Sequence, residues 1–271
     1  MLDKLQNAVI SDEEKKNKEN KKQIYHFDRL KMFFGEDYVV NGISISMPTI
    51  GDILEIGEEK FFQSITPFIY NSTSIRLILW ENGIDWNTVS DIEVFALLMP
   101  TVDHEPLKTI FKDIDMSNFE LVKAKPNNEE EQHLALYNQE QDILLYENDY
   151  MEIAEYIREI FNMHPKKEKA KGSAKKWIIQ EDRMNLEHKR EEQEEDENTS
   201  TLLPLISACI NHPGFKYKLQ ELKEVGIYQF MDSVRRIQKY ESSTAALKGA
   251  YSGFVDSSSW DEKVFDFMSD I

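Results

Sequence analysis

The chain has very little cysteine and no long apolar run. Cys209 is its single cysteine among 271 residues, so no disulfide can form within one chain. No apolar stretch approaches the roughly 20 residues that a membrane-spanning helix needs. Residues 1–22 are charged and lack the apolar segment of a signal peptide. We therefore expect a soluble protein of a reducing compartment, with no membrane partner.

Basic residues are scarce relative to acidic ones. The chain has 32 Lys and Arg against 50 Asp and Glu, a formal net charge of −18. Proteins that bind phosphate backbones usually present a net basic surface, so this balance disfavours nucleic acid as a partner. A local cluster of six lysines leaves one alternative open, in which they contact nucleic acid rather than solvate a linker. These lysines are Lys166, Lys167, Lys169, Lys171, Lys175 and Lys176.

Known catalytic and cofactor motifs are also missing. The chain has no P-loop, no G-x-G-x-x-G and no G-x-S-x-G pattern. Cys209 and His212 form a C-x-x-H pair, but no second pair exists to complete a tetrahedral zinc site. The apolar run around Cys209 does not favour a reactive thiolate. We expect no catalytic residue, no metal, no cofactor and hence no enzyme.

The patterns that are present predict an α+β fold that is mostly helical. Residues 38–40 and 43–47 flank Asn41-Gly42, the strongest two-residue turn signal, and together they predict a β-hairpin. Residues 118–147 again look strand-like. Thr49 with Asp52 predicts a capping box at a helix start, as does a second pair at residues 90 and 93. We therefore expect an N-terminal domain that is mostly helical with small antiparallel β-hairpins, followed by an all-α C-terminal module.

Composition divides the chain into four segments. They are a flexible charged arm (1–22), an α+β domain (23–164), a charged linker (165–199) and a helical C-terminal module (200–271). The linker runs from lysine-rich to glutamate-rich sequence with few apolar residues, which predicts a solvated helix or a disordered tether. In the module, a helix from about residue 227 should place Asp232, Arg235 and Arg236 in water, with Asp232 and Arg236 at the favourable i,i+4 spacing.

The last residues of the chain are candidates for partner binding. Apolar side chains recur there at helical spacing among acidic residues, typical of a helix that docks into a partner's groove. The alternative is a terminal helix folded back on the module, because so short a helix is marginal without packing. The apolar residues are Trp260, Val264, Phe267, Met268 and Ile271.

Three stretches resemble proteins encoded in the tail modules of long-tailed bacteriophages. The first reads GISISMPTIGDILEIGEEKFF (42–62), the second covers 85–99, and the third covers 226–240 with 247–253. The nearest family is the phage tail assembly chaperones. These stretches are packing patterns, so no family residue role is carried over to a position here.

The resemblance implies a non-enzymatic protein of the host bacterial cytoplasm. It would keep the long tape-measure protein soluble and recruit tail-tube subunits. A structural component of the tail or neck is the alternative, and the oligomeric state is left open.

Overall fold

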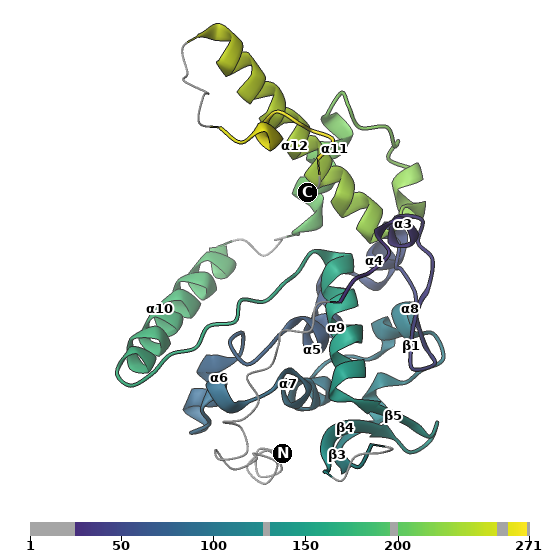
Figure 1. Cartoon of the computed structure of the whole chain (residues 1–271), viewed down its shortest axis with the longest axis vertical. Coiled ribbons are helices and arrows are strands. Elements are labelled where there is room, and N and C mark those ends of the chain that lie inside the picture. The colour runs from purple at the N-terminus through teal and green to yellow at the C-terminus, as the bar shows by residue number, and fades with distance from the viewer. Residues whose placement is uncertain (1–24, 127–130, 196–199, 254–259, 270–271) are drawn as a thin grey trace.

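The computed structural model describes residues 25–126, 131–195, 200–253 and 260–269 (Figure 1). The predicted arm at 1–22 lies outside these residues. The strands are β1 (Tyr38–Val40), β2 (Ile43–Ile45), β3 (Phe119–Ala124), β4 (His133–Asn138) and β5 (Ile143–Tyr146). The α-helices are α3 (Arg29–Phe33), α4 (Ile50–Ile56), α5 (Glu58–Ile69), α6 (Arg76–Glu81), α7 (Asp91–Leu98), α8 (Lys108–Phe111), α9 (Glu147–Phe161), α10 (Ala174–Glu195), α11 (Leu202–Asn211) and α12 (Ile227–Ser252). Short 3-10 helices are η1 (Trp86–Thr88), η2 (Met99–Thr101), η3 (Glu105–Leu107), η4 (Met116–Asn118), η5 (Glu221–Glu224) and η6 (Glu262–Val264). The predicted α+β, mostly helical class is confirmed.

Local sequence signals account for the first elements. Asn41 and Gly42 both have positive φ, 46° and 82°, as a two-residue hairpin turn requires. Val40 pairs with Ile43 directly across this turn. The predicted capping box forms at α4, where Thr49 N donates to the Asp52 carboxylate at 2.7 Å. The second predicted box forms at the start of α7.

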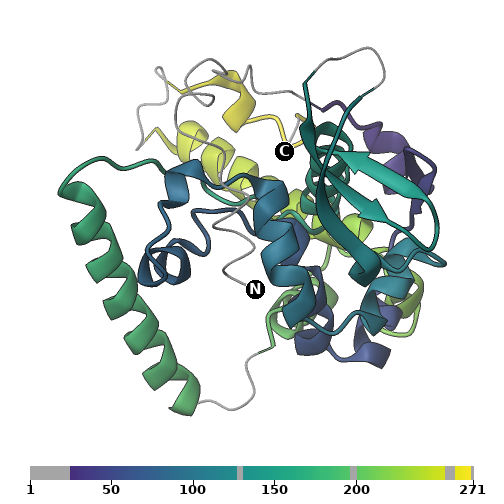
Figure 2. The same cartoon turned by 90° about the horizontal axis from the view of Figure 1, so that it is seen from below.

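The main core lies between helices and a three-stranded sheet. This antiparallel sheet has the order β3-β4-β5. Helix α9 contacts β4, β5, α5 and α7, so it is the central element of the N-terminal part (Figures 1 and 2). One face of α9 is apolar at helical spacing, and Ile153, Ile157 and Ile160 on that face are fully buried.

A buried charge links three of these helices. Arg158 of α9 has no exposed side-chain surface, and its guanidinium lies 3.1 Å from the Asp91 carboxylate and 2.8 Å from that of Glu155. It also donates to the backbone carbonyls of Phe68 at 3.0 Å and Tyr70 at 3.3 Å. The buried cation is therefore compensated by four acceptors, which fix the positions of α5, α7 and α9.

The start of the C-terminal part belongs to the same core. Ile50 N donates to the Val225 carbonyl at 3.0 Å, and Ile227 N donates to that of Pro48 at 2.9 Å. Seven of the described residues after residue 200 are buried in this shared core: Leu202, Cys209, Leu222, Val225, Ile227, Tyr228 and Phe230. Hydrophobic packing thus extends across residue 200. Independent folding of the two predicted domains stays a prediction.

Two further contacts hold these parts together. The first is a close approach at Gly51, where a Cβ atom would lie 2.7 Å from the Lys223 carbonyl oxygen. The second is Glu58, whose carboxylate accepts hydrogen bonds from Thr201 N at 2.7 Å and Leu202 N at 2.9 Å, and from the Ser200 hydroxyl. A residue of α5 therefore caps the N-terminus of α11.

The segment predicted as a charged linker forms a helix, α10, over much of its length. The residues before this helix are hydrogen-bonded to the N-terminal part. Asn71 Nδ2 donates to the Lys166 carbonyl at 3.0 Å, and Asn87 Nδ2 donates to that of Ala170 at 2.9 Å. These contacts were not predicted, because the polar groups that hold the segment lie about 80 to 95 residues earlier in the chain.

Helix α10 is also attached to α6. Arg76 Nε donates to the Asp182 carboxylate at 2.5 Å, and Ile179 is buried in a small second hydrophobic cluster. Of the two expectations, a solvated helix or a disordered tether, the disordered tether does not hold for residues 166–182, which make specific contacts with the N-terminal part.

Candidate partner-binding surface

Helix α12 has a buried beginning and an exposed end. Ile227, Tyr228 and Phe230 in its first two turns are almost fully buried, while Tyr251 is 86% exposed. The first part packs against α3 and α9, and the rest extends away from the body (Figure 1). The far half is only partly covered, because Ser243 is buried there while Tyr240 and Tyr251 are 46% and 86% exposed.

The tail that follows is not the amphipathic helix predicted from spacing. Its described residues contain one 3-10 turn, η6, and further turns. The Asp261 carboxylate accepts from Lys263 N at 2.9 Å, and that of Asp266 accepts from Met268 N at 2.9 Å. Short acidic side chains that bond to backbone N–H groups two residues ahead favour turns over a continuing helix. The apolar residues do recur at helical spacing, but the predicted helix is wrong.

The tail folds back onto α12. Arg236 Nη1 donates to the carbonyls of Phe267 at 3.1 Å and Ser269 at 2.9 Å. The ring of Phe267 meets that of Tyr240 edge-on, with centroids 5.5 Å apart. The tail therefore lies against α12, as the folded-back alternative expects, but without forming a helix. Its apolar side chains stay partly exposed.

The predicted partner-binding residues remain available at the surface. Trp260 is 37% exposed, Val264 40%, Phe267 47% and Met268 76%. Ile271 lies outside the described residues. We call the second half of α12 (residues 240–252) together with residues 260–269 the C-terminal arm. The structure brings Phe267 onto α12 and stacks Trp260 on Phe265. The two predicted aromatic residues thus have different ring partners.

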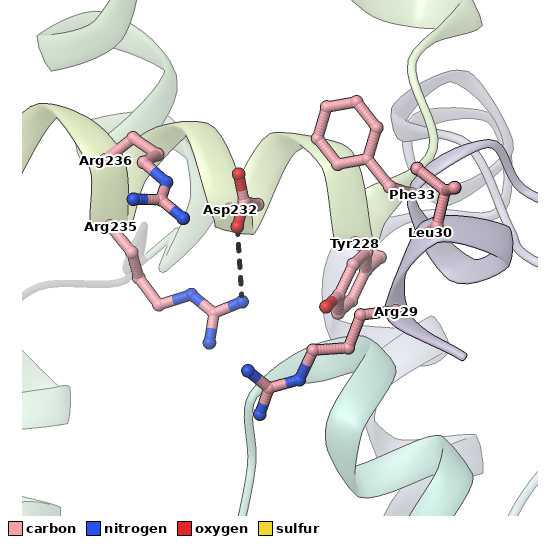
Figure 3. A pocket seen from close by; sticks show the side chains of 7 residues that line it. All are labelled: Arg29, Leu30, Phe33, Tyr228, Asp232, Arg235 and Arg236. Atoms are coloured by element: carbon pink, nitrogen blue, oxygen red, sulfur yellow. Dashed lines mark ion pairs between the residues drawn. The ribbon is translucent and has the colours of Figure 1, made fainter. Parts of the chain in front are cut away.

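A pocket of about 340 Å³ opens beside this arm, where α3 crosses the first turns of α12 (Figure 3). We call it the arginine pocket. Its lining residues are Arg29, Leu30 and Phe33 from α3, and Tyr228, Asp232, Arg235 and Arg236 from α12. Three guanidinium groups therefore face one carboxylate, in a chain whose net charge is −18.

Two of the three cations of the pocket, Arg29 and Arg235, have only distant partners. Arg29 Nη2 lies 3.7 Å from the Glu159 carboxylate. Arg235 Nη2 lies 3.9 Å from the Asp232 carboxylate, and Arg235 Nη1 is 3.4 Å from Asn162 Oδ1. Arg235 Nε is shielded from solvent and has no acceptor in the described part of the chain. These separations are long for charge-assisted hydrogen bonds, which are usually about 2.7–2.9 Å.

Tyr228 contributes an uncharged donor to the pocket. Its ring is buried, and the Arg235 guanidinium carbon lies 6.0 Å from the ring centroid. Burial raises the pKa of the Tyr228 hydroxyl, and the negative charge of Glu159 raises it further. The hydroxyl is therefore protonated at neutral pH and makes no hydrogen bond to the described residues. In Figure 3 it lies between the side chains of Arg29 and Arg235.

The pocket was not predicted from the sequence. Asp232, Arg235 and Arg236 were expected in water, but each is only partly exposed because α3 and the tail lie against α12. The expected Asp232–Arg236 pair is replaced by Asp232–Arg235. Arg29 lies about 200 residues from Arg235, and no spacing rule connects two such positions.

The residues of the C-x-x-H pair, Cys209 and His212, lie in different surroundings. Burial raises the pKa of the Cys209 thiol. His212 Nε2 lies 2.9 Å from the Glu241 carboxylate. Within the described residues, no group of three or more His, Cys, Asp or Glu side chains is placed to hold a metal ion.

Two of the six clustered lysines are engaged in ion pairs. Lys175 lies 2.5 Å from the Asp85 carboxylate and sits over the Trp86 ring, while Lys167 lies 3.6 Å from that of Asp91. These contacts favour a structural role for part of the lysine cluster.

Among the described helices, none combines the length and the apolar character needed to cross a bilayer.

Comparison with known proteins finds one similarity, in the C-terminal part of the chain. Residues 191–271 match the family model described as YomV second domain, a phage-derived family of the Bacillus prophage type. The matched region includes α11, α12 and the C-terminal arm. The C-terminal part of the chain is thus similar to a phage-associated domain. No curated protein and no solved structure shows significant similarity to the chain.

Proposed function

We propose that this chain is a non-enzymatic phage protein that works by binding other phage proteins during tail assembly. In this proposal it acts as a tail assembly chaperone in the host bacterial cytoplasm, with the tape-measure protein and tail-tube subunits as partners. The similarity of residues 191–271 to a phage-derived domain supports the phage origin. The resemblance of residues 42–62 and 85–99 to tail-module proteins supports a role in tail assembly.

One observation carries the binding role. The C-terminal arm exposes Tyr240, Tyr251, Trp260, Phe267 and Met268 within a short stretch of chain that projects from the body (Figure 1). Aromatic and methionine side chains are enriched in the centres of protein interfaces. An assembly chaperone needs such a surface to cover the apolar faces of its client.

The arm can be tested by substitution. Trp260→Ala with Phe267→Ala should abolish or strongly reduce capture of the co-expressed tape-measure protein, since a central aromatic anchor contributes about 2 kcal/mol or more to binding. The melting temperature should stay unchanged because neither side chain is in the core. Trp177→Ala with Leu54→Ala is a matched control, because these side chains are 72% and 54% exposed on other elements.

Two outcomes would contradict the proposal. Unchanged capture by the arm variant would exclude the arm as the binding surface. A large drop in melting temperature would show that the arm is structural. Finding the protein as a stoichiometric part of purified virions would favour the alternative, a structural component of the tail or neck.

A further inference from the structure

The arginine pocket contains more hydrogen-bond donors than its own acceptors can satisfy. Arg29 and Arg235 approach it from α3 and α12, and their ion-pair separations are 3.7 and 3.9 Å. Arg235 Nε and the Tyr228 hydroxyl have no acceptor in the described part of the chain. Arg29 is 62% exposed and can bond to water, whereas the buried Arg235 Nε cannot, so leaving that donor without a partner costs free energy that a suitable acceptor would recover.

We infer that the arginine pocket binds a carboxylate of an acidic peptide segment in a partner protein. The Nε and Nη2 atoms of an arginine form a fork that matches the two oxygens of a carboxylate. Because Arg235 Nε is shielded from solvent, binding through this fork requires the Arg235 side chain to rotate toward the pocket. Arg29 and the Tyr228 hydroxyl complete the donor set from the opposite side (Figure 3).

The surroundings favour a peptide over a free ion. Leu30 at the pocket is 67% exposed, and Phe34, packed edge-on against Phe33, is 70% exposed. Apolar surface beside the charged site suits an apolar residue next to the acidic one. Arg236 in the same pocket already binds two backbone carbonyls of the tail, so a polypeptide lies along one side of the site.

The charge of the chain favours a carboxylate over nucleic acid. A phosphate backbone would bring many charges toward a protein of net charge −18, and the repulsion would grow with each phosphate. A single acidic side chain experiences chiefly its immediate surroundings, because salt screens distant charges beyond about 8–10 Å. The volume of about 340 Å³ is near the lower limit of ligand pockets, which suits one or two side chains.

This inference rests on the proposed protein-binding function, but it can be tested with the purified chain alone. The probe is a synthetic library of randomised seven-residue peptides, selected on immobilised protein and read by sequencing. Selected peptides should be enriched in Asp or Glu beside an apolar residue. The double variant Arg29→Gln with Arg235→Gln should lower the affinity for the selected peptides about tenfold or more, as the loss of charge-assisted hydrogen bonds predicts.

The control removes the same charge elsewhere. Arg183→Gln with Arg190→Gln changes two exposed arginines of α10 and should leave peptide binding intact. If the glutamine variant does not fold, Arg29→Lys with Arg235→Lys retains the charge without the fork and should still weaken binding. A 20-nucleotide DNA is tested in parallel with each variant.

Three results would overturn the inference. The first is selection of peptides without acidic enrichment. The second is equal peptide affinity for the pocket variants and the α10 control. The third is DNA binding that depends on Arg29 and Arg235 while peptide binding does not. Because the library contains no phage protein, a failure here is distinct from a failure of the proposed function, which the capture experiment with Trp260 and Phe267 tests separately.

Discussion

Arg158 and Arg235 both lie where helices meet, but their surroundings differ. Arg158 in the body has no exposed side-chain surface, and four acceptors lie within 3.3 Å of its guanidinium. Arg235 beside the C-terminal arm is 22% exposed, its acceptors lie at 3.4 and 3.9 Å, and its Nε has no partner in the described residues. The first arrangement is complete without a ligand, whereas the second leaves donors free for one.

The aromatic residues follow the same division. Phe61, Phe68 and Phe95 of α5 and α7 are fully buried, while Trp260 and Phe267 of the arm remain exposed. In the body, apolar burial stabilises the fold at about 25 cal/mol per Å² of surface removed from water. In the arm, Trp260 and Phe267 keep 37% and 47% of their surface in water, so their burial contributes less to folding.

The largest expected effect separates the two arginines. Arg158→Ala should destabilise the protein by about 3–5 kcal/mol, because it leaves the Asp91 carboxylate without its buried partner. Arg235→Ala should cost less than about 1 kcal/mol, since its contacts are long and partly solvated. Urea unfolding followed by circular dichroism measures both values. Equal losses for the two variants would remove the distinction between the buried arginine of the body and the arginine pocket.

A smaller effect is expected at the junction between the two regions. Glu58→Gln removes the charge that caps α11 and should cost about 1 kcal/mol at pH 7. Glu59→Gln, one residue along α5, is exposed and should change stability by less than about 0.5 kcal/mol. Urea unfolding of both variants checks the difference, and equal losses would show that the cap contributes nothing beyond the loss of a surface charge.

The same substitution predicts a pH dependence with a definite sign. Burial alone would raise the pKa of Glu58, but hydrogen bonds from Ser200, Thr201 and Leu202 hold the pKa below the ordinary 4.5. The stabilisation is therefore fully present above pH 4.5 and is lost as the pH falls through the lower folded-state pKa. The stability difference between wild type and Glu58→Gln should shrink on acidification. A difference that grows as the pH falls would refute this role of Glu58.

Elements that depend on neighbours in the sequence were predictable. The Asn41-Gly42 turn and the capping box of Thr49 with Asp52 each involve a few adjacent residues, and both form as expected. The apolar stripe of α9 is also evident in the sequence and is buried as its periodicity implies.

Elements that depend on distant partners were not predictable. The start of the charged linker looks unable to order itself, but Asn71 and Asn87 supply hydrogen bonds that its own composition does not reveal. The tail has helical spacing, yet Asp261 and Asp266 bond to nearby backbone groups and favour turns instead. The arginine pocket requires Arg29 to meet α12, which only the tertiary structure determines.

Hydrogen exchange with and without the partner tests the central claim most directly. The chain is purified alone and in complex with the co-expressed tape-measure protein, and amide exchange is compared by mass spectrometry. Binding through the C-terminal arm predicts slower exchange at residues 240–252 and 260–269 in the complex, with α9 and the β3-β4-β5 sheet unchanged. Protection confined to the sheet or to α10, with the arm unaffected, would contradict binding through the arm.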